Sequence, residues 1–108
     1  MGRYLVIESR DPIADPGASA AYELAGSLAS NTEVTVFLTH NAVFGARASA
    51  PSSGELISTL GSATVVADDF ALSQRGLAPG DLVPGVQVAD IDLVVDLVVD
   101  DGRTVIWS

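Results

Sequence analysis

Two hydrophobic patterns alternate along the chain and predict alternating strands and helices. Nearly continuous apolar runs, typical of strands covered on both faces, occupy residues 3–8, 33–38, 64–67, 86–88 and 103–107. Between them, apolar residues recur at helical spacing or follow helix-start signals, which predicts helices over residues 16–30, 52–60, 68–75 and 89–99. Short connections between alternating elements predict an α/β fold. We expect one three-layer αβα domain over residues 1–108, with a mostly parallel sheet of four to five strands.

Local signals mark where the first three helices begin. Asp15 before Pro16 is a good helix start, because Asp caps free amides and Pro fits the first helical position. Ser52 and Glu55 have capping-box spacing, and Asp68 is placed to cap the third helix. In the first helix we expect one buried apolar face, formed by Ala21, Leu24, Ala25 and Leu28.

Residues 89–99 are rich in valine, which favours a strand, but the pattern does not alternate. Acidic residues recur every four positions, which favours a helix. We expect this helix to bury Ile91, Val94, Val95 and Val98. The like charges Asp92, Asp96 and Asp100 are interpreted as a solvated acidic stripe, and the alternative is a subunit interface that supplies arginines.

Charge and composition exclude several classes of function. The formal net charge is −9, and all five basic residues are arginines. Nucleic acid and anionic membrane surfaces are therefore unfavourable partners. The absence of lysine excludes a Schiff base or a P-loop lysine. No apolar stretch is long enough to span a membrane, and the apolar run at residues 4–7 is too short for a signal peptide, so we expect a cytoplasmic protein.

The order of the elements resembles the DsrE/DsrF/TusD family of sulfur-transfer domains over nearly the whole chain. The resemblance is carried by an Ala- and Ser-rich first helix (18–29), the strand exit FLTHNAV (37–43), QRGL (74–77), and LVPGV (82–86) before a helix and a strand ending in Trp107. It implies a DsrE-like fold.

Active members of that family carry sulfur as a persulfide on a cysteine after the third strand. The corresponding position falls at Asp68, to within one residue, and the chain contains no cysteine. A persulfide needs a thiolate, and a carboxylate cannot replace it. The resemblance therefore implies a non-catalytic subunit without persulfide transfer of its own. It would form a homo-oligomer (trimer or hexamer), or a hetero-oligomer with a cysteine-bearing DsrE-like subunit in a sulfur-relay assembly.

The alternative is a small-molecule or anion-binding module with a pocket at the C-terminal edge of the sheet, where α/β proteins commonly bind ligands. The residues predicted to bind there are Ser9, Arg10, His40, Asn41, Asp68, Asp69 and Arg75. We identify no catalytic residue, metal cluster or cofactor fingerprint. An enzyme with His40 and Asp68 as acid and base is the third hypothesis, and the sequence leans away from enzymatic activity.

Each of these residues also has a structural interpretation. Asp68 and Asp69 suit a helix cap and first-turn acid, and His40 suits a polar loop. Arg10, like Arg47, suits surface salt bridges. Arg75 either pairs with Asp68 or Asp69 or interacts with the C-terminus of its own helix. For Phe44, Phe70 and Trp107 we expect core or interface anchors.

Overall fold

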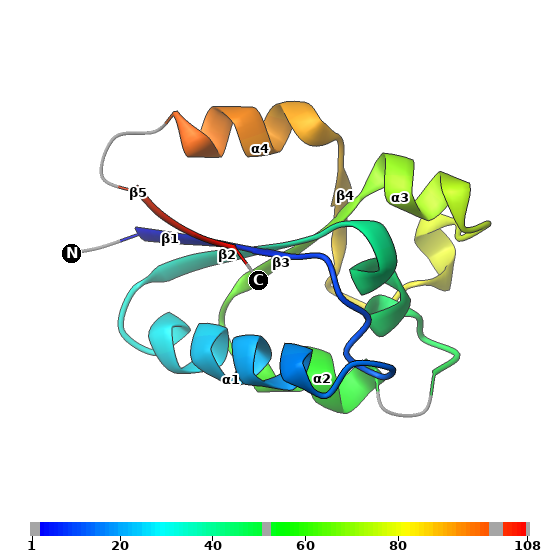
Figure 1. Cartoon of the computed structure of the whole chain (residues 1–108), viewed down its shortest axis with the longest axis horizontal. Helices are drawn as coiled ribbons and strands as arrows, with labels where there is room; N and C mark the ends of the chain where they lie inside the picture. Colours follow the sequence, from blue (N-terminus) through cyan, green and yellow to red (C-terminus); the bar gives the residue numbers. More distant parts are fainter. Residues whose placement is uncertain (1–2, 51–52, 100–102, 108) are drawn as a thin grey trace.

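Five parallel strands form one sheet in the order β4-β3-β2-β1-β5 (Figure 1). The computed structural model describes residues 3–50, 53–99 and 103–107. The strands are β1 (Arg3–Glu8), β2 (Glu33–Leu38), β3 (Thr64–Asp68), β4 (Gln87–Ala89) and β5 (Arg103–Trp107). All pairings between them are parallel, which confirms the expected sheet.

Helices cover both faces of this sheet and produce the expected three-layer αβα domain (Figure 1). They are α1 (Gly17–Ala29), η1 (His40–Ala46, a 3-10 helix), α2 (Ser53–Thr59), α3 (Asp69–Gln74), η2 (Pro79–Asp81, 3-10) and α4 (Ile91–Val98). Helices α1 and α2 lie against one face, α4 lies against the other, and α3 stands at the carboxyl edge. None of the described helices is long and apolar enough to cross a bilayer.

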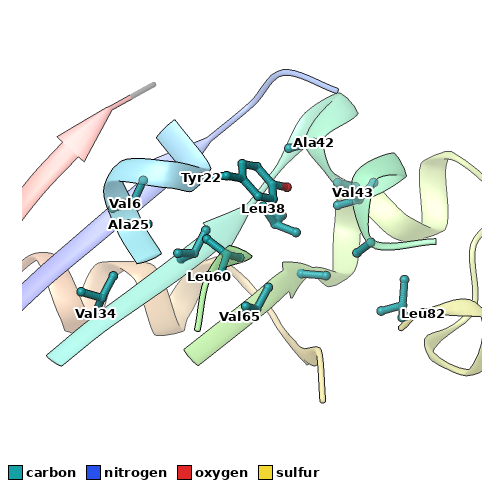
Figure 2. Packing of buried hydrophobic residues seen from close by; sticks show 14 of the residues in the cluster. Val6, Tyr22, Ala25, Val34, Leu38, Ala42, Val43, Leu60, Val65 and Leu82 are labelled. Carbon is teal, nitrogen blue, oxygen red and sulfur yellow. The ribbon is translucent and has the colours of Figure 1, made fainter. Parts of the chain in front are cut away.

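The face under α1 and α2 carries the larger hydrophobic core (Figure 2). On α1 the buried residues are Ala18, Tyr22, Ala25 and Ala29, so of the expected face Ala25 is confirmed, Leu28 is partly buried, and Leu24 differs. Leu24 is exposed, because it lies two positions from the inward-facing Tyr22 and therefore on nearly the opposite side of the helix. At Gly26 a Cβ would lie 2.0 Å from the Thr59 carbonyl oxygen, so α1 and α2 approach too closely for any side chain there.

The face under α4 carries a smaller cluster, formed by Leu5, Ile7, Phe37, Val66 and Val94. The predicted buried face of α4 is wrong except at Val94. The helix instead turns Val94 inward with Leu93 and Leu97 partly packed beside it, because one short helix cannot bring its whole apolar surface onto the sheet. A row of aliphatic side chains, each 46–71% exposed, is left outside; we call it the α4 stripe, and it consists of Ile91, Val95, Val98 and Val99.

Because all strands are parallel, their carboxyl ends meet at one edge. The predicted first and last residues of the strands and helices agree with the structure within one or two positions. His40, for which a polar loop was one interpretation, begins the 3-10 helix η1, and Ser52 of the expected capping box lies outside the described residues. Side chains alternate between faces along a strand. Thr39 and Asp68 therefore lie on the face of Phe37 and Val66, toward α4, whereas Glu8 lies on the opposite face.

Candidate functional site at the carboxyl edge

A pocket of about 520 Å³ opens where β2, β3 and β4 end. It is lined by Thr39, His40, Asp68, Asp69, Phe70, Ala71, Ser73, Gln74, Arg75, Asp90 and Ile91. Four of the seven predicted ligand-binding residues therefore meet in one cavity: His40, Asp68, Asp69 and Arg75. Polar groups gather at the rim, while the exposed Phe70 and Ile91 supply apolar wall.

Asp68 is 8% exposed and has both carboxylate oxygens engaged. Oδ1 accepts a hydrogen bond from the Phe70 amide at 3.2 Å, which confirms that Asp68 caps α3. Oδ2 accepts a bond from the Thr39 hydroxyl at 3.0 Å, across the ends of β2 and β3. Asp68 therefore joins two strand ends and a helix start while it lines the pocket.

His40 begins η1 in a strained backbone conformation. Its φ of 49° lies in the left-handed region, which non-glycine residues seldom adopt. The exposed imidazole thereby stands at the pocket rim, directly after Thr39. Such strain is found preferentially at functional sites, and here it coincides with the pocket.

Arg75 does not pair with Asp68 or Asp69, so the first of its two expected interactions is wrong. Its Nε and one terminal nitrogen donate to the Asn41 side-chain oxygen at 3.1 and 3.0 Å. The other terminal nitrogen donates to the Ala71 carbonyl at 3.1 Å, which confirms the expected interaction with the C-terminus of α3. Asn41 thus contributes by holding Arg75 in place.

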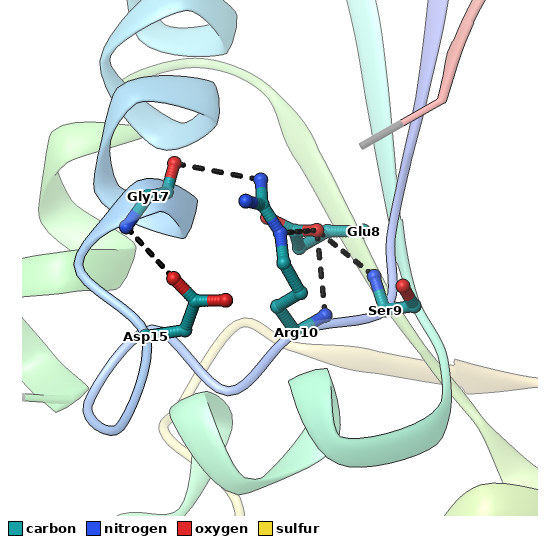
Figure 3. A network of polar contacts seen from close by, with 5 residues as sticks. All are labelled: Glu8, Ser9, Arg10, Asp15 and Gly17. Carbon is teal, nitrogen blue, oxygen red and sulfur yellow. Dashed lines mark hydrogen bonds and ion pairs between the residues drawn. The ribbon is translucent and has the colours of Figure 1, made fainter.

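Ser9 and Arg10 do not line the pocket. They belong to a separate network around Glu8, on the opposite face of the sheet (Figure 3). Glu8 is fully buried, accepts the Ser9 amide at 2.9 Å and pairs with the Arg10 guanidinium at 3.3 Å. The expected salt bridge of Arg10 is confirmed, and its partner is a buried carboxylate. Arg10 also donates to the Gly17 carbonyl, which ties the loop to the start of α1.

Tyr22 lies near this network with its hydroxyl buried and without a hydrogen-bond partner among the described residues. Burial raises the pKa of the Tyr22 phenol well above its ordinary value, and the negative charges of Glu8 and Asp11 raise that pKa further. Tyr22 therefore stays neutral and acts as a core side chain.

Sequence reasoning missed the apolar wall of the pocket and one of its acids. Asp90 caps α4 by accepting the Asp92 amide at 3.0 Å, and its position before an apolar run was the available signal. Phe70 is 66% exposed and Trp107 is also exposed, so neither is a core anchor. In the described part of the chain, no group of three or more His, Cys, Asp or Glu side chains is placed to hold a metal ion.

Comparison with solved structures identifies the architecture. The crystal structure of the YchN protein from E. coli matches with a TM-score of 0.87 over 100% of both chains, at 18% sequence identity. The fold is DsrE-like. A protein of unknown function from Methanobacterium thermoautotrophicum, MTH1491, matches with a TM-score of 0.78, also over 100% of both chains and at 18% identity. No family model and no curated protein sequence matches the chain. At this identity the likeness concerns the DsrE-like fold alone.

Proposed function

We propose that this chain is a non-catalytic DsrE-like subunit of a cytoplasmic assembly of the sulfur-relay type. It would act as a structural partner, in a homo-oligomer (trimer or hexamer) or beside a cysteine-bearing DsrE-like subunit. The α4 stripe is the observation that carries this proposal. Four large aliphatic side chains on a helix of eight residues and its cap are exposed, and grouped exposed apolar surface is typical of protein interfaces.

The chemistry at Asp68 supports the non-catalytic part of the proposal. Where the resemblance places a persulfide cysteine, this chain has a carboxylate whose two oxygens are engaged by Thr39 and Phe70. A carboxylate cannot form a persulfide. The position therefore stabilises the scaffold at the point where an active subunit would carry sulfur.

The test is native mass spectrometry of the protein isolated gently from its source, together with a variant of the α4 stripe. Val95→Ser with Val98→Ser removes apolar surface without touching the core, and we expect it to dissociate the assembly. Leu24→Ser is the matched control, because Leu24 is equally exposed but lies on α1. A native monomer, or an assembly that survives the α4 variant, would contradict the proposal.

The pocket favours a second function, the binding of a small molecule. Its apolar wall at Phe70 and Ile91 adjoins the polar groups of His40 and Asp69, the combination that ligand sites commonly present. A thermal-shift screen of metabolites tests this function. We expect a stabilising ligand whose effect is reduced by Phe70→Ser. A screen without any stabilising compound argues against it.

A further inference from the structure

The arginines divide into two groups by their partners. Arg3 and Arg103 lie 4.0 and 3.5 Å from the Glu33 carboxylate, and Arg10 pairs with Glu8. Arg47 and Arg75 pair with no carboxylate within the described residues, in a chain whose acids outnumber its basic residues by 14 to 5. Where acids are in such excess, two cations without an acidic partner need a specific explanation.

These two cations converge on one aromatic ring. The guanidinium carbon of Arg47 lies 5.0 Å from the centroid of the Phe44 ring, and that of Arg75 lies 5.9 Å from it. Their separation cannot exceed the sum of those distances. Both positive charges therefore lie around the same partly exposed ring, to which each is attracted by cation–π interaction.

Both guanidinium groups make hydrogen bonds within the chain, and both keep N–H groups that have no partner among the described residues. Arg47 donates from Nε to the Phe44 carbonyl at 3.0 Å, which leaves its four terminal N–H groups without a partner among the described residues. Arg75 uses three of its five N–H groups on Asn41 and Ala71, which leaves two. Each guanidinium therefore presents unused donors in a planar fork, the geometry that binds oxyanions in a bidentate manner.

We infer that Arg47 and Arg75, positioned by Phe44 and Asn41, form a binding site for an oxyanion, that is, a phosphate, sulfate or carboxylate group. Phe44 and Arg47 do not line the pocket, so this site lies beside the pocket and shares only Arg75 with it. The acids Asp68 and Asp69 line the pocket and disfavour an anion inside it. The inference is independent of the subunit role proposed above.

The experiment is a titration of the full chain with inorganic phosphate at constant ionic strength, followed by the NMR signals of the arginine Nε–H groups. We expect saturable shifts at Arg47 and Arg75. Loss of charged hydrogen bonds in Arg47→Gln should weaken phosphate binding about tenfold or more. Arg47→Lys should restore only part of it, because lysine keeps the charge without the planar fork. Arg3→Gln is the matched control, since it removes the same charge far from the site.

Titrations with other anions identify the class of oxyanion that binds, and a second variant controls for a loss of folding. Sulfate and acetate, titrated in the same way, distinguish a tetrahedral group from a carboxylate. Arg75→Gln tests the second cation. If it fails to fold because Asn41 and Ala71 lose their donor, Arg47→Gln still decides, since Arg47 makes a single hydrogen bond. Equal shifts with chloride, or wild-type phosphate affinity in Arg47→Gln, would overturn the inference.

Discussion

The two faces of the sheet differ in how completely helices cover them. Under α1 and α2, a broad core is closed by helices that touch at Gly26, where even a methyl group would collide with Thr59. Under α4, a smaller cluster is covered by one helix that leaves the α4 stripe in solvent. The α4 face retains apolar surface that no described part of the chain covers, which is the property expected of an interface.

Truncation of the core should give the largest difference between the faces. Leu60 has no exposed surface and belongs to the larger cluster, so Leu60→Ala should lower the free energy of unfolding by about 3–5 kcal/mol. Val95→Ala, on the α4 stripe, should change it by less than about 0.5 kcal/mol in the isolated chain. Urea unfolding measures both. Similar losses in the two variants would mean that the faces are equally well packed.

A pair of glycine variants sharpens the comparison next. Gly26→Ala should cost about 1–3 kcal/mol, because its methyl group would overlap the Thr59 carbonyl and push α1 from α2. Gly54→Ala, in α2 with open space around its Cβ, should stabilise by about 0.5–1 kcal/mol through helix propensity. Thermal and urea unfolding of the two variants decide. A neutral Gly26→Ala would show that the helix contact is loose.

At the carboxyl edge, Asp68→Ala should cost about 1–2 kcal/mol, since the α3 cap is lost and the Thr39 hydroxyl loses its acceptor. Asp68→Asn should retain more stability, because its amide oxygen still accepts. Asp69→Ala is the control, an exposed first-turn acid whose removal should cost only a few tenths of a kcal/mol. Equal losses from Asp68→Ala and Asp69→Ala would contradict the role assigned to Asp68.

At neutral pH a small effect is expected at Tyr22, and its contribution becomes visible only at alkaline pH. The raised pKa of the phenol means that the unfolded chain loses this proton near pH 10 while the folded protein keeps it. Above that pH the unfolded state binds fewer protons, so stability should fall with rising pH by up to about 1.4 kcal/mol per unit. Tyr22→Phe should abolish this part of the decline and leave stability at pH 7 equal or up to about 1 kcal/mol higher. Denaturant unfolding across alkaline pH tests the difference.

The sequence was sufficient for the order of the elements because buried parallel strands are nearly continuous apolar runs bounded by turn residues. It was insufficient for helix faces. The pattern of α4 identifies which residues are apolar, but only the width of the sheet contact decides that Val94 is covered and Val95 is not. In α1, the spacing of Leu24, Ala25 and Leu28 fits one helical face, but the contact with the sheet turns the face of Ala18, Tyr22 and Ala29 inward.

The contacts in the candidate site also differ in whether the sequence could predict them. The Asp68 cap is local, so three neighbouring residues were enough to predict it. The bond between Arg75 and Asn41 joins positions 34 residues apart, and no periodicity encodes it. Glu8 was predicted as part of the first strand but not as a site residue, because nothing in the strand pattern indicates its ion pair with Arg10.

The arginine pair on Glu33 has a consequence for how the sheet is assembled. In the strand pairing, Arg3 stands beside both Glu33 and Arg103, so the three charges form one row across β2, β1 and β5. Sliding β5 by a single residue would take Arg103 out of that row and turn Val105 to the wrong face. The row therefore favours the observed register of β5, because a shift by one residue would separate Arg103 from Glu33.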